Sequence, residues 1–308
     1  MIHGLPDDGL RAFSGYLGIE PFSVPSSEEP DILVAMVPRH PSSPHSSSCA
    51  THLQLVREAS GRDVLKGIGG AVLLPPKDRQ TRVELFGDTL SGHFALLHAA
   101  LSRSLMLRGV AVLHAAVVNA YDRTLLIVGE SGTGKSTLSL TLALRGARLL
   151  SDDTVALRLE SADRVMATPF RPDLLLRQPS LSILPPDLRQ AAELFQAEGE
   201  QKWRISRGRM HGMTADAALP DTLIFLESGA GATRSSRVRE LGATEAMARL
   251  MHAFGAFFLS RKRPLERESV AGLFEGLLSQ GRPYSVQLGR SLLDDPDRGV
   301  EEFLSLLV

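Results

Sequence analysis

Cysteine is almost absent from this chain, because Cys49 is the only one in 308 residues. A lone cysteine excludes an internal disulfide and a zinc site built from several cysteines, and such sparing use is typical of a reducing compartment. Residues 1–13 also carry a proline and acidic residues where an export signal requires basic residues followed by an apolar run. We therefore expect a cytoplasmic protein.

Long apolar runs and an excess of one charge are absent as well. The apolar stretch at residues 109–120 is interrupted by His114 and is too short to cross a bilayer as a helix. Lysine and arginine number 34 against 35 aspartate and glutamate residues, so the net charge is −1 and gives no general attraction to polyanions. These absences predict a protein that binds neither membrane nor nucleic acid.

The hydrophobic content of 43% is enough for a full core and for one large domain or two smaller ones. Residues 1–88 predict a small strand-rich N-terminal lobe, with strands over 32–37, 52–56, 71–74 and 82–86. Residues 38–48 have too few apolar side chains for their burial to offset the entropy lost on ordering. They therefore predict a mobile surface loop that contains His40 and His45. Apolar residues at helical spacing predict a bridging helix over 89–109.

Residues 89–308 predict a second domain of α/β class, with a mixed sheet and flanking helices. Apolar runs at 110–118 and 125–128 read as strands around a turn, followed by a helix over 136–144. Later strands are expected over 148–150, 154–159, 221–227 and 284–288, and later helices over 244–254 and 266–278, before a short terminal helix.

The most informative segment runs from Gly129 to Ser136 and reads GESGTGKS. It is a complete G-x-x-x-x-G-K-[ST] pattern between an expected strand and an expected helix, which is the context of a phosphate-binding loop. Glycines let successive backbone N–H groups converge on phosphate oxygens at the positive end of the helix. Lys135 would then reach the terminal phosphates, and the Ser136 hydroxyl would bind Mg²⁺. The alternative is a glycine-rich turn that binds nothing.

Two adjacent aspartates, Asp152 and Asp153, follow the first strand expected after this loop, and Asp152 comes 17 residues after Lys135. Neighbouring side chains at a strand end point in opposite directions. One carboxylate could therefore face a bound metal ion while the other accepts the proton of an acceptor hydroxyl. The alternative is that both aspartates only cap a turn.

Residues 113–116 (LHAA), 129–137 (GESGTGKST) and 144–153 (LRGARLLSDD) together resemble the catalytic domain of bacterial HPr kinase/phosphorylase. That family shares its phosphate-binding core with the phosphoenolpyruvate carboxykinases. The resemblance covers about 45 residues, and the order of the later strands and helices is compatible with it. It implies a P-loop kinase core of this α/β type in residues 89–308 and an ATP-dependent transfer of phosphate to a serine hydroxyl.

Position by position, the resemblance implies a role for each matching residue. Asp152 would be the acid/base group, and Asp153 would hold Mg²⁺ together with Ser136. His114 would lie beside the reacting centre, although a histidine that starts an apolar strand can equally be a core residue. The ATP phosphates would be held by Gly129, Ser131, Gly132, Thr133, Gly134, Lys135, Ser136 and Thr137.

Three departures from the family pattern concern the acceptor. Thr137 stands where kinases that act on HPr have glutamate, Ala115 follows His114 where they have glycine, and their Arg-Gly-Leu-Gly-Ile-Ile-Asn-Val signature is missing. The chain looks closer to stand-alone HPr-kinase-like proteins, some of which phosphorylate a serine of a ribosomally made precursor peptide. We expect a serine in a peptide or protein, or free serine, as the acceptor. HPr kinases form hexamers, so a homo-oligomer is compatible with the resemblance.

Phosphoryl transfer also needs cations beyond the phosphate-loop lysine. Arg171 and Arg177 form one candidate pair and Lys202 and Arg204 another, with a solvated surface position as the alternative for each. Two other functions compete with the kinase: a P-loop ATPase that uses water as acceptor, and a non-catalytic nucleotide-binding regulator. The lack of a recognisable downstream Walker-B strand counts against the ATPase, and the intact Lys135, Ser136 and aspartates count against the regulator.

Overall fold

The computed structural model describes most of the chain. The described residues are 2–3, 32–37, 54–58, 63–67, 70–74, 80–86, 90–161, 163–171, 173–197, 200–229, 233–254 and 264–307. The chain divides into two compact units, the first formed by Met1–Arg108, Gln196–Gln201 and Ser260–Arg267 and the second by the remaining residues. The expected loop over 38–48, with His40 and His45, and Cys49 lie outside the described residues.

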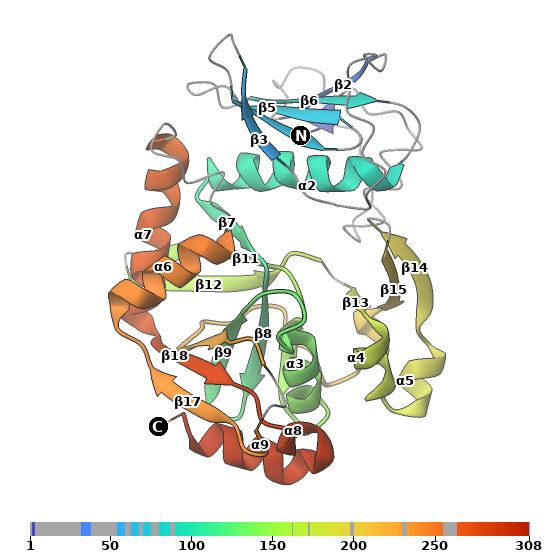
Figure 1. Cartoon of the computed structure of the whole chain (residues 1–308), viewed down its shortest axis with the longest axis vertical. Helices are drawn as coiled ribbons and strands as arrows, with labels where there is room; N and C mark the ends of the chain where they lie inside the picture. The colour runs from blue at the N-terminus through green and yellow to red at the C-terminus, as the bar shows by residue number, and fades with distance from the viewer. Residues whose placement is uncertain are drawn as a thin grey trace. The chain divides into compact units, whose positions relative to one another are not determined.

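The first unit contains a six-stranded sheet with the strand order β1-β2-β6-β5-β4-β3. Helix α2, Leu90–Met106, packs along this sheet (Figure 1). The strands are β1 Ile2–His3, β2 Ile32–Val37, β3 Gln54–Arg57, β4 Asp63–Gly67, β5 Gly70–Leu74 and β6 Thr81–Phe86. The sequence patterns missed β1 and β4, since β1 has two residues and β4 (DVLKG) mixes charge and glycine with only two apolar residues. The expected bridging helix is α2, which groups with the first unit; the domain division expected after residue 88 stays a prediction.

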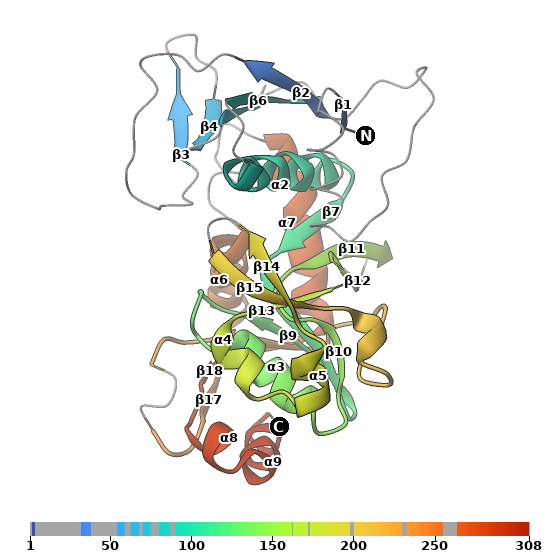
Figure 2. The same cartoon turned by 90° about the vertical axis from the view of Figure 1, so that its right-hand side faces the viewer.

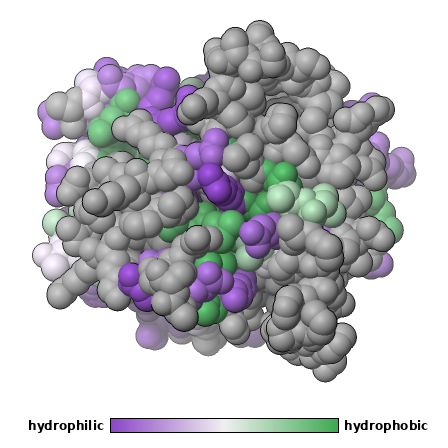
Figure 3. Space-filling view, turned by 90° about the horizontal axis from the view of Figure 1, so that it is seen from above, coloured by the Kyte–Doolittle hydropathy of each residue, from purple (hydrophilic) through white to green (hydrophobic). Residues whose placement is uncertain are grey.

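The alternation of side chains along β6 explains which face of this sheet is covered. Thr81, Val83 and Leu85 are buried while Arg82 between them is exposed. Arg103 of α2 is fully buried and donates a hydrogen bond of 3.0 Å to the Thr81 hydroxyl, so the buried face is the one that carries α2. In the view from above, hydrophobic and hydrophilic residues lie next to one another among the described atoms (Figure 3).

The second unit is built on a mixed six-stranded sheet with the order β10-β8-β9-β16-β18-β17. Strands β9, β16 and β18 run parallel to one another, and β8 and β10 continue the sheet in antiparallel pairing on the other side of β9. The strands are β8 Ala115–Ala120, β9 Arg123–Val128, β10 Arg148–Ser151, β16 Thr222–Leu226, β17 Arg237–Glu240 and β18 Arg282–Gln287. This arrangement is the mixed α/β class that the sequence predicted.

Two smaller sheets and a set of helices complete the description. Figure 2 shows both small sheets, whose strand orders are β12-β11-β7 and β13-β15-β14. Their strands are β7 Val110–Leu113, β11 Val155–Ser161, β12 Arg164–Pro169, β13 Leu174–Leu176, β14 Glu193–Ala197 and β15 Glu200–Ile205. The helices are α3 Lys135–Ala143, α4 Gln178–Ser182, α5 Pro186–Gln190, α6 Ala243–Phe254, α7 Pro264–Gln280, α8 Ser291–Asp294 and α9 Pro296–Ser305, with a 3₁₀ turn at Arg207–Arg209. In the part of the chain that the structure describes, no helix is both long enough and apolar enough to cross a membrane.

The apolar run expected as one strand over 110–118 is in fact two strands that belong to different sheets. Leu113 at the end of β7 pairs with Val155, whereas Ala115 at the start of β8 pairs with Val128 of β9. His114 lies at the junction, where the chain passes from one sheet to the other. The single-strand prediction was wrong because both sheets bury their strands and leave one continuous apolar pattern.

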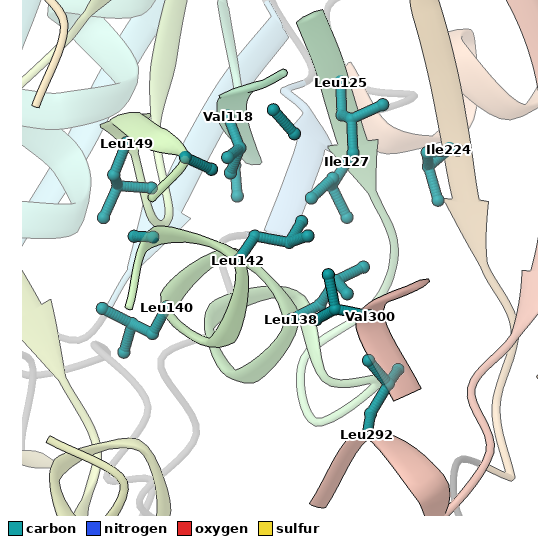
Figure 4. Packing of buried hydrophobic residues seen from close by; sticks show 14 of the residues in the cluster. Val118, Leu125, Ile127, Leu138, Leu140, Leu142, Leu149, Ile224, Leu292 and Val300 are labelled. Carbon is teal, nitrogen blue, oxygen red and sulfur yellow. The ribbon is translucent and has the colours of Figure 1, made fainter. Parts of the chain in front are cut away.

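Helix α3 is held under the central sheet by a cluster of leucines. Leu138, Leu140 and Leu142 are buried in one apolar cluster with residues of β8, β9, β10 and β16, and Leu138 lies beside Val300 of α9 (Figure 4). Burying one leucine contributes about 1.5–3 kcal/mol, so the three side chains fix the helix firmly. The loop between β9 and α3 is therefore anchored at both of its ends in the core.

Candidate active site

The phosphate loop joins the carboxyl end of β9 to the amino end of α3, as its sequence predicted. Gly132 and Gly134 have φ angles of 84° and 102°, in the left-handed region that favours glycine. A Cβ on Gly129 would lie 2.7 Å from the Thr133 hydroxyl oxygen and 3.0 Å from the Leu226 Cβ. Because the backbone takes conformations and approaches that a side chain would block, the segment fits a phosphate cradle formed by main-chain N–H groups.

Side chains of the loop stabilise its shape from within. The Thr133 hydroxyl donates a hydrogen bond of 2.8 Å to the Glu130 carbonyl oxygen. The Lys135 ammonium donates to the carbonyl oxygens of Gly129 at 2.6 Å and Glu130 at 3.0 Å, and this side chain is almost entirely buried. Burial lowers the pKa of Lys135, and the charge of Arg177 acts in the same direction. The ammonium thus lies at the Gly129 end of the loop.

The two aspartates lie in the turn that follows β10, next to the start of α3. Ser136 at the beginning of α3 donates a hydrogen bond of 3.4 Å to the Asp152 carbonyl oxygen. The turn itself is closed by Ser151, whose hydroxyl donates to the Thr154 carbonyl oxygen at 2.7 Å and accepts from the Thr154 N–H at 3.2 Å. Ser151 therefore performs the capping that the sequence had offered as the alternative role for the aspartates.

Asp153 is held between a guanidinium group and an imidazole ring. Arg171 donates to Oδ2 of Asp153 at 2.7 Å, and Nδ1 of His114 lies 3.1 Å from Oδ1. Burial alone would raise the pKa of Asp153, but His114, Arg171, Lys202 and Lys135 together lower it to about 2. Asp153 is consequently ionised at any physiological pH.

Asp152 has the opposite environment. Only 3% of its surface is exposed, and its Oδ2 atom has no hydrogen-bond partner among the residues that the structure describes. Burial, and then the negative charge of Asp153, raise the pKa of Asp152 to about 7. Adjacent carboxyl groups whose pKa values are pushed apart in this way are the usual arrangement for assigning one charged role and one proton-transfer role.

His114 is not a core residue. Its side chain is 47% exposed and faces Asp153 from the junction of β7 and β8, so the alternative of a buried structural histidine was wrong. Loss of hydration lowers the pKa of His114, and the attraction of Asp153 partly offsets this effect. The structure thus brings His114, Lys135, Ser136, Asp152 and Asp153 together beside the phosphate loop.

The four candidate cations outside the loop have different surroundings. Arg171 is buried and bound to Asp153, so a surface position was wrong for it. Arg177 is exposed and donates to the Ser131 hydroxyl of the loop at 2.9 Å, and Lys202 is near enough to lower the pKa of both aspartates. Arg204 instead pairs with Glu193 at 2.7 Å, away from the aspartates, and fits the surface alternative.

Replacing Arg171 with glutamine should lower the free energy of unfolding by about 2–4 kcal/mol, since removing one member of a buried ion pair leaves the other charge uncompensated. The cost stays below that of a fully buried pair because Asp153 is 24% exposed. Urea unfolding at neutral pH measures the effect. Arg164→Gln, on the exposed part of β12, is the matched control, and equal stability of both variants would contradict the prediction.

A cavity beside the phosphate loop was not foreseen. It has a volume of about 620 Å³ and is lined by His114, by the first part of the loop, by the end of β16 and by one side of α6. Strand β16 lies parallel to β9 and is followed directly by Glu227. A buried apolar strand that ends in a carboxylate next to the phosphate-loop strand has the form of a Walker-B strand. The sequence argument that such a strand is missing was therefore wrong, and the run TLIFLE at 222–227 was the available signal.

Comparison with known proteins agrees with the motif analysis over part of the chain. Residues 106–175 match the family described as HPr Serine kinase C-terminal domain. The HPr kinase/phosphorylases of Bacillus cytotoxicus and Bacillus mycoides are each 42% identical over 62 residues, which cover 20% of this chain and 19% of each relative. The chain therefore spans about one fifth of the length of the curated relatives it matches.

A solved structure titled as the HPr(Ser) kinase/phosphatase from Coxiella burnetii covers 42% of this chain and 76% of its own, at 21% identity and a TM-score of 0.27. A similarity of that size does not establish a shared fold. The family match carries the assignment instead, because it includes Lys135, Ser136, Asp152 and Asp153. Residues 106–175, which contain the phosphate loop and the paired aspartates, are therefore similar to the C-terminal domain of HPr kinases.

Proposed function

We propose that this protein is an ATP-dependent kinase that transfers the γ-phosphoryl group to a serine hydroxyl of a peptide or protein. The observation that carries the proposal is Asp152, a buried carboxyl group with an unpartnered oxygen and a raised pKa beside the phosphate loop. A structural aspartate would be expected to satisfy both of its oxygens. Asp152 instead has the properties of a general base that is held ready for a proton.

In the proposed reaction, Asp152 in its ionised form accepts the proton of the serine hydroxyl. The serine oxygen forms a bond to the γ-phosphorus as the bond between that phosphorus and the oxygen bridging to the β-phosphate breaks. Phosphoserine and ADP result, and Asp152 later releases the proton to solvent. Lys135 and the loop N–H groups hold the phosphates, and Arg171 keeps Asp153 ionised and in place.

The residues present fit ATP and Mg²⁺ as cofactors. Two glycines with positive φ and the crowded position of Gly129 give the backbone cradle that a triphosphate needs. The Ser136 hydroxyl and the Asp153 carboxylate would hold Mg²⁺, which prefers oxygen ligands and few protein carboxylates. Bound Mg²⁺ would supply neutralisation of the charge on the transferred phosphoryl group.

The identity of the acceptor rests on the departures from the pattern of kinases that act on HPr. Thr137, Ala115 after His114, and the missing signature favour a serine outside HPr, such as one in a ribosomally made precursor peptide. A cytoplasmic location and a homo-oligomer, as in related kinases, belong to the same proposal.

One observation favours ATP hydrolysis as a second candidate function. Glu227 follows the strand beside the phosphate loop, at a position from which many P-loop ATPases activate water. Here, however, Glu227 accepts hydrogen bonds from Ser285 and Arg249. Those contacts occupy one of its oxygens and favour the kinase over the ATPase.

The deciding experiment incubates the protein with ATP and Mg²⁺ together with serine-containing peptides, HPr or free serine. Mass spectrometry should detect one added phosphoryl group on one acceptor, and ADP formation should increase in its presence. Equal ADP formation with and without every acceptor would support the ATPase and overturn the kinase. ATP binding without any turnover would support the third candidate, a non-catalytic nucleotide-binding regulator.

The rate of transfer should depend on pH through Asp152. Its pKa of about 7 means that the ionised, proton-accepting form is in the minority below neutrality. We therefore expect kcat/KM to rise about tenfold per pH unit below pH 7 and to level off above it. Initial rates measured between about pH 5 and 9, with the ionic strength held constant, give this profile. A flat profile from pH 5 to 7 would contradict Asp152 as the base.

A further inference from the structure

The pairing of β13 with β15 brings two cations of the second unit close to one another. Leu176 of β13 lies opposite Trp203 of β15 in antiparallel register, and Leu176 belongs to the core cluster against which Trp203 packs. Arg177 continues the extended backbone of β13, with φ −84° and ψ 161°, so the next step of the register places it opposite Lys202. Like charges at opposite positions of two strands repel one another. Such a pair of cations is therefore expected where an anion binds.

Arg177 reaches the phosphate loop itself. Its side chain is exposed, and Nη1 donates a hydrogen bond of 2.9 Å to the Ser131 hydroxyl of the loop. Burial lowers the pKa of Lys135, and the positive charge of Arg177 lowers it further. Lys135 is the lysine that reaches terminal phosphates in loops of this kind. The guanidinium group of Arg177 is therefore close to the part of the loop that would hold the terminal phosphate.

Lys202 acts on the aspartates instead of the loop. Against the effect of burial, His114, Arg171 and then Lys202 lower the pKa of Asp153, and the charge of Lys202 acts on Asp152 as well. The side chain of Lys202 is half-buried, and among the residues that the structure describes it forms no hydrogen bond and no ion pair. A partly buried charge without a partner costs free energy until an anion compensates it.

The phosphoryl group that is transferred is the anion common to both places. In the proposed reaction it passes from the phosphate loop, which Arg177 contacts, to an acceptor hydroxyl beside the aspartates, where Lys202 acts. The ionised carboxylate of this site, Asp153, is engaged at both of its oxygens by Arg171 and His114. The positive charge of Lys202 therefore remains available for a phosphate oxygen.

We propose that Arg177 and Lys202 together bind the γ-phosphoryl group of ATP and stabilise the charge on its oxygens during transfer. Arg177 would exchange the neutral Ser131 hydroxyl for phosphate oxygens, which form stronger, charge-assisted hydrogen bonds. Lys202 would bind the oxygens of the same group on the side of the acceptor. Cations placed in this way lower the barrier because charge develops on the phosphoryl oxygens as the bonds change. The inference rests on the proposed kinase activity and adds two residues that contact its reacting group.

Nucleotide binding without turnover provides the first test. Arg177→Gln and Lys202→Gln, in the full chain with Mg²⁺, are titrated calorimetrically with ADP and with AMP-PNP, an ATP analogue that keeps a γ-phosphate and resists hydrolysis. Each substitution should weaken AMP-PNP binding about tenfold and ADP binding less than about threefold, because the lost hydrogen bonds go to the γ-phosphate alone. Arg204→Gln is the matched control, since it removes a cation of the same strand that pairs with Glu193, and it should keep both affinities.

Turnover supplies the second measurement. In each variant kcat should fall about a hundredfold to a thousandfold, as the loss of one preorganised donor at a developing charge usually causes, while KM for the acceptor stays near its original value. Lys202→Arg and Arg177→Lys keep the positive charge and should recover part of the rate. Thermal unfolding verifies that every variant is folded.

The outcomes separate this inference from the kinase proposal. An unchanged preference for AMP-PNP over ADP in either variant would overturn the cation pair and leave the kinase intact. Equal losses of ADP and AMP-PNP affinity would overturn it too, because the two residues would then only support the loop, and so would a raised acceptor KM with normal kcat. Absence of transfer to every acceptor by the parent protein would overturn the kinase activity, and the two titrations would still decide whether Arg177 and Lys202 bind the γ-phosphate.

Discussion

Replacing Asp152 with asparagine is expected to slow phosphoryl transfer by about a hundredfold to ten-thousandfold, the usual contribution of a well-placed acid/base group. Asparagine has nearly the same shape but cannot accept the proton of the serine hydroxyl. Nucleotide binding should change little, because Asp152 contributes only its carbonyl oxygen to the contact with Ser136, and asparagine keeps that atom. The loss should therefore appear in kcat and leave the Kd for ATP near its original value.

Single-turnover transfer and ATP binding, measured on the same preparation, test this expectation. Asp187→Asn on α5 is the matched control, since it makes the same chemical change on an exposed surface. Near-normal turnover of Asp152→Asn would shift the role of base to another residue. A large rise in the Kd for ATP would instead place Asp152 in nucleotide binding.

The same variant should be more stable than the parent protein at neutral pH. The folded pKa of Asp152, about 7, lies above the unfolded value, so its contribution to stability is fully present at low pH and is lost as pH rises through 7. Between about pH 4 and 7 this effect costs up to about 4 kcal/mol. The neighbouring Asp153, with a lowered pKa, acts in the opposite direction and loses its contribution only as pH falls toward 2.

Urea unfolding as a function of pH separates the two aspartates. From pH 4 to 7 the parent should lose more stability than Asp152→Asn, whose side chain cannot ionise. Identical slopes for the two proteins would show that Asp152 is ionised in the fold at acid pH. A variant that is inactive yet more stable would identify a residue kept for chemistry at a cost in stability.

Lys135→Ala should lower kcat/KM for ATP by about a hundredfold to a thousandfold, as the loss of one preorganised cation at a developing charge usually does. Its ammonium is buried at the Gly129 end of the loop and contacts two carbonyl oxygens there. Alanine would remove the cation that reaches the terminal phosphates and leave the backbone N–H groups in place. We therefore expect ADP to bind better than ATP in this variant.

Isothermal titration with ATP and ADP, alongside turnover measurements, tests the role of Lys135. Lys66→Ala, on an exposed position of β4, is the control for the loss of one lysine charge. Equal losses of ATP and ADP affinity would indicate that Lys135 supports the loop rather than the terminal phosphate. Lys135→Arg should restore little of the lost ATP turnover, since the planar guanidinium group does not replace a compact ammonium.

The local sequence was sufficient to predict the phosphate loop. Gly132 and Gly134 have the positive φ angles that the pattern requires, and the flanking strand and helix begin and end within about two residues of the prediction. The position of Asp152 and Asp153 after β10 was also predicted, because an apolar run that ends in charged residues marks a strand end. These features depend on backbone chemistry within a few residues, and that chemistry can be read from the sequence.

Features that combine distant segments could not be read in this way. Arg171 looked like a surface residue, yet it is buried against Asp153, a contact that depends on how β12 returns toward β10. The split of residues 110–118 between two sheets was hidden because both strands are buried and equally apolar. The cavity beside the phosphate loop joins the end of β16 at Leu226 to helix α6, which starts at Ala243, and no short sequence pattern connects the two.

By itself, the sequence determined that this protein has a phosphate loop followed by a pair of aspartates, and an α/β core able to support them. Only the tertiary structure decided that these two carboxyl groups differ. Burial and the negative charge of Asp153 raise the pKa of Asp152 to about 7. Arg171 and His114, which come from other elements, lower the pKa of Asp153 and keep it ionised. Hydration and charge at a given atom depend on every segment that packs around it, and such packing is a property of the folded chain.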